Sequence, residues 1–167
     1  MRLLALDPAL RNSGYAILLK EGSRTFAVAY GVIRNKADLS MPGCLVEIHR
    51  QIADLIRLHS PEECAVEGVI FVQNLRTAMT LGAARGSALL AAAQHGIPIY
   101  EYPPRRVKQA VVGYGTAQKS QVSFMVRSLL GLAETPEADA ADALAIGLTH
   151  LQMLSSPLAI RRVNSPL

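Results

Sequence analysis

Three apolar stretches with the spacing of β-strands open the chain. Residues 2–7 (RLLALD) are apolar up to Asp7 and are followed by a proline, which indicates a buried strand that ends at the aspartate. Residues 14–20 (GYAILLK) and 25–34 (TFAVAYGVIR) predict two further strands, joined by a short turn around Gly22. Consecutive strands with a short connection predict an antiparallel meander.

The rest of the chain alternates between helical and strand patterns. Apolar residues recur at helical spacing from Pro42 to Leu58, and Asn74 is a suitable cap for a helix that continues to Gln94. These helices are followed in turn by two short strands, residues 64–69 and 97–102. Three more helices are expected: a basic one at 105–113, one that begins after a Thr116 cap, and one at 137–153.

This order of elements predicts an α/β fold with one five-stranded mixed sheet. The antiparallel meander and the parallel strands added to it are flanked by helices. No composition shift or repeat marks a boundary, so residues 1–153 are expected to form one domain. Residues 154–167 lack a clear period and are expected to form a flexible C-terminal tail.

Composition narrows the class of protein. Half of the 167 residues are apolar, yet few are aromatic and none is tryptophan, so the core must consist mainly of Ala, Val, Ile and Leu. Cys44 and Cys64 fit no metal-ligand spacing and are expected to be reduced thiols. Because the chain shows neither a signal peptide nor a membrane-length apolar segment, we expect a soluble, cytoplasmic protein.

The positive charge is unevenly distributed. The net charge is only +4, but residues 68–133 contain a single acid, Glu101. The same segment holds seven basic residues: Arg76, Arg85, Arg105, Arg106, Lys108, Lys119 and Arg127. This distribution predicts a surface for a polyanion such as a nucleic acid.

Four acids stand among apolar or small residues: Asp7, Glu67, Asp139 and Asp142. Asp7 and Glu67 lie near the ends of predicted strands, whereas Asp139 and Asp142 share one face of the last predicted helix. If that helix packs beside the first strand, the carboxylates converge and repel one another unless divalent cations bind them. Mg²⁺ prefers carboxylate oxygens, and two ions about 3.5 to 4 Å apart support phosphodiester hydrolysis in many nucleases.

Each acid has a simpler interpretation when it is taken alone. Asp7 can cap the turn from Arg11 to Gly14, and Glu67 can be a salt-bridged acid in the core. Asp139 can be a solvated acid in the first turn of a helix, where the helix dipole favours it. The metal-site hypothesis therefore depends on the four acids being together.

Several basic residues are candidates to bind a phosphate. Lys119 falls in the first turn of a predicted helix, where backbone amides and a cation can hold a phosphate jointly, although a solvated surface lysine is the simpler alternative. Arg105, Arg106 and Lys108 are expected to follow the phosphate backbone rather than read bases, which makes binding sensitive to salt. The histidines have no ligand spacing and are interpreted as surface or hydrogen-bonded core residues: His49, His59, His95 and His150.

Four stretches of the sequence together resemble the RuvC family of Holliday junction resolvases, bacterial endonucleases with the ribonuclease H-like fold. They cover most of residues 1–152: LALDPALRNSGYAIL, AVEGVIFVQNLRTAMTLGAARG, YPPRRVKQAVVGYGTAQKSQVSFMVRSLLGL and PEADAADALAIGLTH. The resemblance implies a homodimer that binds a four-way DNA junction and cuts two opposing strands symmetrically in recombination and repair. It also implies hydrolysis with two Mg²⁺ ions per site, or Mn²⁺ in their place, leaving a 5′-phosphate.

The same resemblance assigns roles to individual residues. The family's catalytic metal ligands fall on Asp7, Glu67, Asp139 and Asp142, and Lys119 is expected to assist catalysis. DNA contacts are expected from Arg76, Arg105, Arg106, Lys108, Lys119 and Phe71. The Gly/Ala-rich helix implies a dimer interface at Gly82 and Gly86, and the RuvA and RuvB branch-migration proteins are candidate partners.

Two positions depart from the family pattern. Ala9 and Leu10 replace the usual Gly and Ser after Asp-Pro, which raises the possibility of a shifted backbone beside the metals. Ile70 occupies the position of an aromatic residue that stacks on junction bases, and Phe71 follows it as a substitute.

Other functions were considered beside resolution of junctions. A related nuclease acting on RNA or other branched DNA would keep the fold, and so would a protein that binds junctions without cutting them. An actin-like ATPase needs two such domains around a nucleotide, which 167 residues cannot supply.

Overall fold

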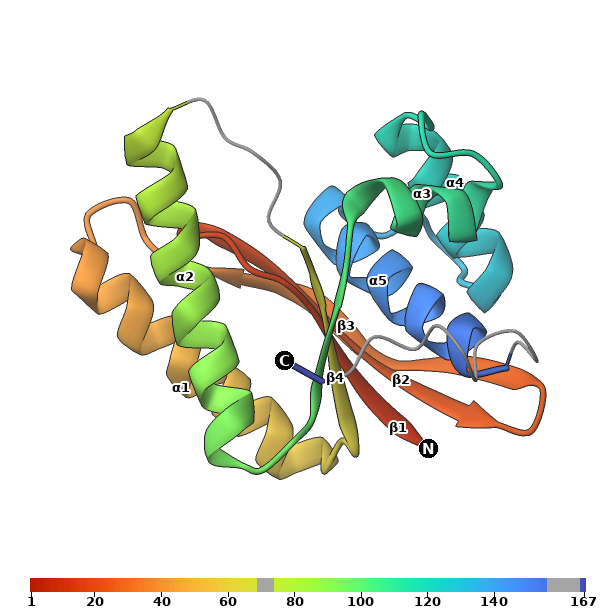
Figure 1. Ribbon diagram of the computed structural model, residues 1–167, viewed down its shortest axis with the longest axis horizontal. Helices are drawn as coiled ribbons and strands as arrows, with labels where there is room; N and C mark the ends of the chain where they lie inside the picture. Colours follow the sequence, from red (N-terminus) through yellow and green to blue (C-terminus); the bar gives the residue numbers. More distant parts are fainter. Residues whose placement is uncertain (69–73, 156–165) are drawn as a thin grey trace.

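The chain forms one mixed β-sheet with helices on both faces, as seen in a computed structural model that describes residues 1–68, 74–155 and 166–167 (Figure 1). The strands are β1 (Arg2–Asp7), β2 (Asn12–Glu21), β3 (Arg24–Arg34), β4 (Glu63–Glu67) and β5 (Ile99–Tyr102). The helices are α1 (Met41–His59), α2 (Leu75–Gln94), α3 (Pro104–Val112), α4 (Lys119–Leu130) and α5 (Ala138–Ser155).

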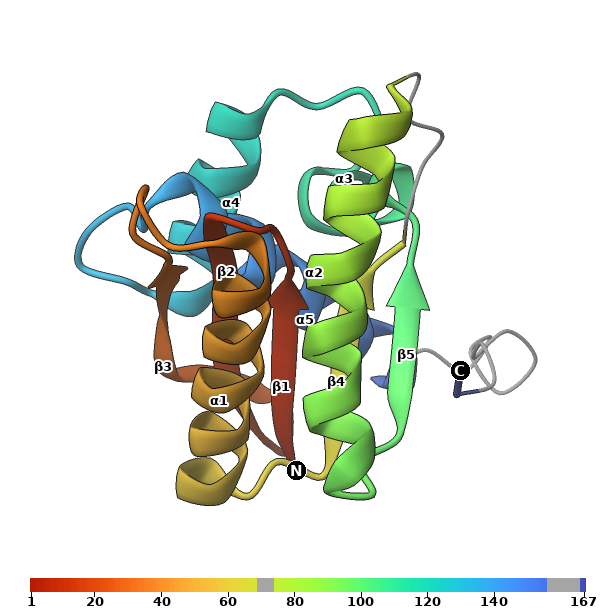
Figure 2. The same cartoon turned by 90° about the vertical axis from the view of Figure 1, so that its left-hand side faces the viewer.

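The sheet has the order β3-β2-β1-β4-β5, which Figure 2 shows from the side of α1 and α2. The first three strands pair antiparallel, and β4 and β5 add parallel to β1. This confirms the predicted α/β fold with a meander extended by parallel strands. It also leaves β1 in the middle of the sheet, where its C-terminal residue is flanked by β2 on one side and β4 on the other.

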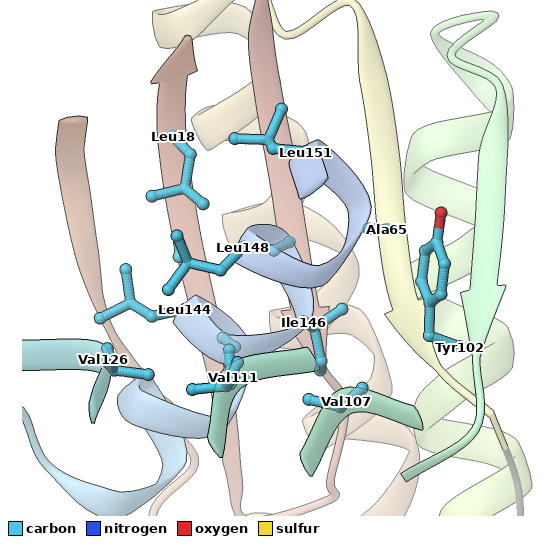
Figure 3. Close-up of a cluster of buried hydrophobic side chains, with 14 of the residues drawn as sticks. Leu18, Ala65, Tyr102, Val107, Val111, Val126, Leu144, Ile146, Leu148 and Leu151 are labelled. Carbon is cyan, nitrogen blue, oxygen red and sulfur yellow. The ribbon is translucent and has the colours of Figure 1, made fainter. Parts of the chain in front are cut away.

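Two apolar layers cover the sheet. One packs α1 and α2 against one face, with four alanines of α2 fully buried: Ala84, Ala88, Ala91 and Ala92. The other centres on α5, which sends Leu144, Leu148 and Leu151 toward the sheet and toward α3 and α4 (Figure 3). The core is built from aliphatic residues and alanine, as the composition predicts.

Helix α5 lies unusually close to the strands because small residues form the contact. A Cβ on Gly147 would come within 2.5 Å of a Leu18 methyl carbon and 3.1 Å of the Ala5 Cβ. Ala140, Ala141 and Ala143, near the start of α5, are also buried. A larger residue in these places would push the helix away from the sheet, so the small residues fix its depth.

Most helix ends follow their sequence signals. The Asn74 side chain accepts a hydrogen bond from the Thr77 amide, which confirms the expected cap of α2. The expected Thr116 cap was wrong, because α4 begins at Lys119. The Gln118 and Gln121 side chains instead form a reciprocal capping box. Glutamine is not among the residues that usually cap helices, so this cap is harder to predict from the sequence than one at threonine.

The structure also bears on the cysteines, on membrane-spanning helices and on the C-terminal tail. Cys44 and Cys64 are both buried free thiols, in agreement with the prediction. None of the helices in the described part of the chain combines the length and apolarity needed to cross a bilayer. Helix α5 continues to Ser155, and the proposed tail at 154–167 stays a prediction because most of it lies outside the described residues.

Candidate active site

The first two candidate carboxylates end neighbouring parallel strands. Leu6 of β1 is paired with Val66 of β4, and Asp7 and Glu67 are the next residues along each strand. Parallel strands deliver their carboxyl ends to the same edge of a sheet, which is where ligands gather in α/β folds. The register therefore brings Asp7 and Glu67 to one point, at the border between the core and solvent.

The start of α5 brings the other two carboxylates to the same edge. Gly14 of β2 is the partner of Asp7 in the sheet, and a Cβ on Gly14 would lie 1.9 Å from the Asp139 backbone oxygen. The first turn of α5 thus rests on the one strand position beside Asp7 that lacks a side chain. Asp139 and Asp142 are both partly buried in the opening turns of this helix.

Electrostatics show that the acids interact with one another. Burial, together with the charges of Asp142 and Asp139, raises the pKa of Asp7 to about 6, against the opposing effect of Lys119. Burial also raises the pKa of Glu67 to about 7, with added contributions from Asp7 and Asp142. Asp7 and Glu67 therefore resist ionisation, because they are partly buried and because neighbouring carboxylates repel their charge.

Lys119 partly balances this charge. Its ammonium Nζ lies 2.9 Å from Asp142 Oδ2, and this hydrogen bond raises the pKa of the lysine. The side chain is 72% exposed while that of Asp142 is 22% exposed, so the pair lies at the mouth of the site. Lys119 is thus more than the solvated surface lysine that was the alternative interpretation.

The remaining expected DNA contacts lie at different distances from the carboxylates. Lys108 is close enough to lower the pKa of Glu67, whereas Arg105 is exposed in the first turn of α3, with its side chain beside Gly115. Arg106 lies against α5, with Nη2 2.8 Å from Met153 Sδ. Arg76 lines a pocket of about 330 Å³ together with the turn that follows Asp7.

Two further expectations concern α2 and the segment before it. Gly82 and Gly86 are exposed on the outer face of α2, and a Cβ at either position would meet no atom within 4 Å. Ile70 and Phe71 lie outside the described residues, so base stacking by either stays a prediction.

The carboxylates do not form a closed metal cage. Within the described ranges, no group of three or more His, Cys, Asp or Glu side chains could hold an ion as it stands. The site is instead an open edge with carboxylates from β1, β4 and α5, one of which is held by a lysine.

Comparison with known proteins places this arrangement in a family. The family model described as crossover junction endodeoxyribonuclease RuvC matches residues 3–150. The chain belongs to the RuvC family. The RuvC protein of Akkermansia muciniphila is 53% identical over 151 residues, which cover 90% of each chain, and that of Desulfitobacterium hafniense is 47% identical over 90% of this chain and 92% of its own.

Solved structures agree with the assignment to the RuvC family. Thermus thermophilus RuvC in complex with a Holliday junction substrate is 32% identical, with a TM-score of 0.88 over 100% of this chain and 99% of its own. The fowlpox virus Holliday junction resolvase is 14% identical, with a TM-score of 0.56 over 90% of this chain and 98% of its own, and shares the fold. Together they confirm the predicted RuvC resemblance and ribonuclease H-like architecture.

The turn after Asp7 accommodates its departure from the usual RuvC sequence. Ser13 Oγ donates to the Ala9 carbonyl oxygen at 2.6 Å and accepts from the Ala9 amide at 3.1 Å. Ser13 therefore closes this turn, which is the structural role that the simpler interpretation gave to Asp7. Asn35 Nδ2 donates to the Leu10 carbonyl oxygen at 2.7 Å, and Leu10 packs against the core. Neither Ala9 nor Leu10 adopts a left-handed backbone, so this RuvC chain needs no glycine there.

Sequence reasoning missed two residues at this site. Gly14 shows no motif of its own, since its importance comes from contact with a helix far along the chain. Arg85 was counted with the basic surface, but its guanidinium is turned inward and donates to the Glu67 backbone oxygen. A glycine within a strand and an arginine in an alanine-rich helix were the available signals.

Proposed function

We propose that this RuvC-family protein is a structure-selective endonuclease that resolves four-way DNA junctions by symmetric phosphodiester hydrolysis in homologous recombination and repair. The observation that carries the proposal is the meeting of Asp7, Glu67 and the first turns of α5 at one edge of the sheet. Clustered, partly buried carboxylates are costly, and a structural protein gains nothing evident from them. A relative with 32% identity is described in complex with a Holliday junction substrate.

The donor set fits hard divalent cations. Asp7, Glu67, Asp139 and Asp142 offer only carboxylate oxygens, the ligands that Mg²⁺ prefers, and their mutual repulsion is what bound cations would relieve. We assign them two Mg²⁺ ions per site, with Mn²⁺ as a substitute. Such ions would activate water and stabilise the leaving oxygen, which gives in-line hydrolysis to a 5′-phosphate.

The basic residues of the site prepare it for a phosphate. Lys119 holds the Asp142 carboxylate in one orientation and, with Lys108, opposes the rise in the pKa of Glu67. Both side chains are therefore near enough to the carboxylates to contact the phosphate that is cut. Their positive charge would favour the extra negative charge that develops during hydrolysis.

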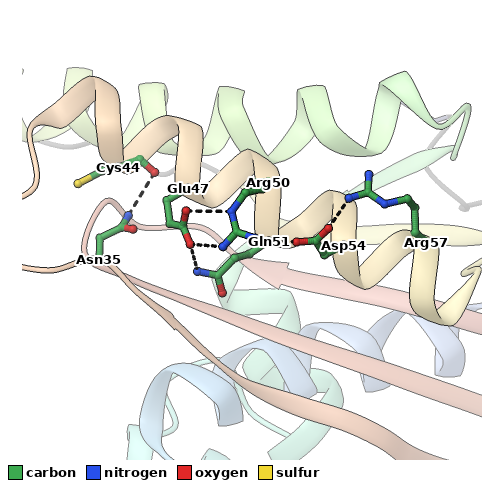
Figure 4. Close-up of polar contacts among 7 residues, drawn as sticks. All are labelled: Asn35, Cys44, Glu47, Arg50, Gln51, Asp54 and Arg57. Atoms are coloured by element: carbon green, nitrogen blue, oxygen red, sulfur yellow. Dashed lines mark hydrogen bonds and ion pairs between the residues drawn. The ribbon is translucent and has the colours of Figure 1, made fainter.

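The DNA surface is best sought around α3, α4 and the start of α2. Basic residues of α1 are unsuitable because acids of the same helix already pair with them, as Figure 4 shows for Arg50 with Glu47 and Asp54 and for Arg57 with Asp54. The expected contacts outside that helix are Arg76, Arg105, Arg106, Lys108 and Lys119. Binding through phosphates predicts affinity that falls steeply with salt.

A homodimer through α2 completes the proposal. The outer face of α2 exposes Gly82 and Gly86 beside the large apolar side chains of Met79 and Leu90. Small residues allow close approach of a second helix, and two sites related by a twofold axis suit a four-way junction. RuvA and RuvB are proposed as partners on the basis of family membership.

Cleavage of synthetic substrates tests the function. A four-way junction, the matching duplex and an RNA–DNA hybrid are incubated with the protein, with Mg²⁺ or with chelator. We expect paired nicks in the junction only, and only with Mg²⁺, and Asp7→Asn should keep junction binding while cutting is lost. Preference for the hybrid would favour a ribonuclease, and binding without cutting by the unaltered protein would favour a junction-binding protein.

Lys119→Ala separates catalysis from binding. Loss of the ammonium that holds Asp142 should slow cleavage by about tenfold or more, while junction affinity falls by about twofold because one phosphate contact is lost. Single-turnover cleavage and fluorescence anisotropy give the two values. Equal losses in both would make Lys119 a phosphate contact alone.

A further inference from the structure

Arg85 is an arginine of α2 that points into the protein. It lies between Gly82 and Gly86 in sequence, yet its side chain is only 11% exposed. Its Nη1 donates to the backbone oxygen of Glu67 at 3.0 Å, and its Nη2 forms an ion pair with Oε2 of Glu101 on β5. One guanidinium therefore ties α2 to the ends of two adjacent strands.

These contacts surround the peptide that follows Glu67. The Gly68 amide donates to the Tyr102 backbone oxygen at 2.8 Å, and Glu67 is the register partner of Tyr102. Arg85 holds the other polar group of the same peptide, the Glu67 carbonyl. With both groups bonded, the peptide plane at the end of β4 is fixed, and so is the direction in which the Glu67 side chain leaves the strand.

Glu101 packs against the same peptide. A Cβ on Gly68 would lie 3.1 Å from Glu101 Oε1, so the carboxylate that pairs with Arg85 rests on the glycine. Burying a guanidinium is costly unless its donors are satisfied. Here the planar fork of arginine reaches a carbonyl and a carboxylate at once, which the single ammonium of lysine does not match.

We propose that Arg85 is a positioning residue that holds Glu67 in its reactive orientation and takes no part in binding DNA. The proposal rests on the proposed function, in which Glu67 is one of the reacting carboxylates. It separates Arg85 from the other basic residues of the segment 68–133, with which the charge pattern groups it.

Three variants test the role. Arg85→Met removes both contacts, and Arg85→Lys keeps the charge but reaches fewer acceptors. Arg2→Met is a matched control, because the Arg2 guanidinium also donates to a backbone oxygen, that of His59 at 2.8 Å, and Arg2 starts β1 at the end of the strand opposite to Asp7. For each variant the single-turnover cleavage rate, the junction affinity in chelator and the thermal midpoint are measured.

We expect Arg85→Met to cut the junction about 10²-fold more slowly, because a displacement of about 1 Å in a reacting group costs that much, with affinity changed less than about twofold. Arg85→Lys should lie between Arg85→Met and the unaltered protein. Arg2→Met should lose thermal stability while its cleavage rate stays within about twofold. Parallel losses of rate and affinity in Arg85→Met would overturn the proposal in favour of a DNA contact, and an unchanged rate in a folded variant would reduce Arg85 to a structural role.

A readout without cleavage keeps the test independent of the proposed function. In the metal-free protein, the carbon resonance of the Glu67 carboxylate and the amide resonance of Gly68 should shift in both Arg85 variants and stay in place in Arg2→Met. If the unaltered protein cut no junction, the proposed function would fail, yet these resonances would still report whether Arg85 sets the environment of Glu67. Unshifted resonances would contradict the positioning role whatever the activity.

Discussion

A single methyl group at Gly14 should disturb the site without touching any of its charges. Gly14 pairs with Asp7 across the sheet, and an added Cβ would lie 1.9 Å from the Asp139 backbone oxygen. Real Cβ atoms essentially never come within 3.0 Å of such an atom, so the two must separate by at least about 1 Å. The neighbour is helix backbone, which cannot rotate away as a side chain can.

The magnitude follows from that displacement. Forcing an extra carbon into a packed contact costs about 1 to 3 kcal/mol. For a chain of 167 residues, each kcal/mol lowers the thermal midpoint by about 3 °C, so Gly14→Ala should unfold about 3 to 9 °C lower. Displacement of Asp139 relative to Asp7 by about 1 Å should also slow junction cleavage by about 10²-fold.

Thermal unfolding and single-turnover cleavage measure the two effects, with Gly31→Ala as the control. Gly31 is also a strand glycine, but its added Cβ would meet the Tyr15 ring, whose end can move, at 3.0 Å or more. We expect the control to stay within about 1 °C and twofold in rate. If Gly14→Ala matched the control in both measurements, α5 would not rest on β2 as described and the argument would be refuted.

Three further predictions concern α2 and the interior. Gly82→Ala should stabilise the isolated chain by up to about 1 kcal/mol, because alanine loses less conformational entropy than glycine when a helix forms. The same change should weaken self-association, measured by sedimentation, by about tenfold. Unchanged self-association would show that Gly82 is not part of the interface. His150→Phe should cost about 2 to 3 kcal/mol in chemical denaturation because it leaves the Tyr102 hydroxyl and the Glu63 carboxylate without their bonds. Burial lowers the pKa of His150 despite Glu63, with Lys20 adding to the effect, so the unfolded chain takes up a proton that the folded protein refuses. The unaltered protein should therefore lose stability relative to His150→Phe as the pH falls from about 7.5 to 5.5, a range in which both proteins gain stability from protonation of Asp7 and Glu67, whose pKa values are raised to about 6 and about 7. The same pH dependence in the two proteins would contradict this origin.

The sheet and its helices were accessible from the sequence because their signals are local. The apolar run that ends at Asp7, the cap at Asn74 and the helical spacing after Pro42 each act within a few residues. Local signals failed at Thr116, where a favourable cap residue was overruled by the glutamine pair that starts α4 two residues later. Propensity is a weak guide when two nearby starts compete.

The candidate carboxylates were found for a different reason. A charged residue at the end of an apolar strand is visible in the sequence, whereas the contacts that hold its side chain in place are not. Arg85 reaches Glu67 across 18 residues of chain, and nothing in its neighbours distinguishes it from an arginine that faces DNA. Gly14 depends on Asp139, which is farther still along the sequence.

The positions of the carboxylates along the chain also determine when the site can be completed during synthesis. Asp7 belongs to the first strand and Glu67 to the fourth, but Asp139 and Asp142 belong to α5, the last helix in the described part of the chain. Because a single domain generally folds as a unit, the carboxylates can meet only after α5 has emerged from the ribosome. On the proposed assignment, a growing or truncated chain that lacks α5 would carry only two of the four metal-binding acids, so we expect an unfinished polypeptide to be unable to nick the genome that encodes it.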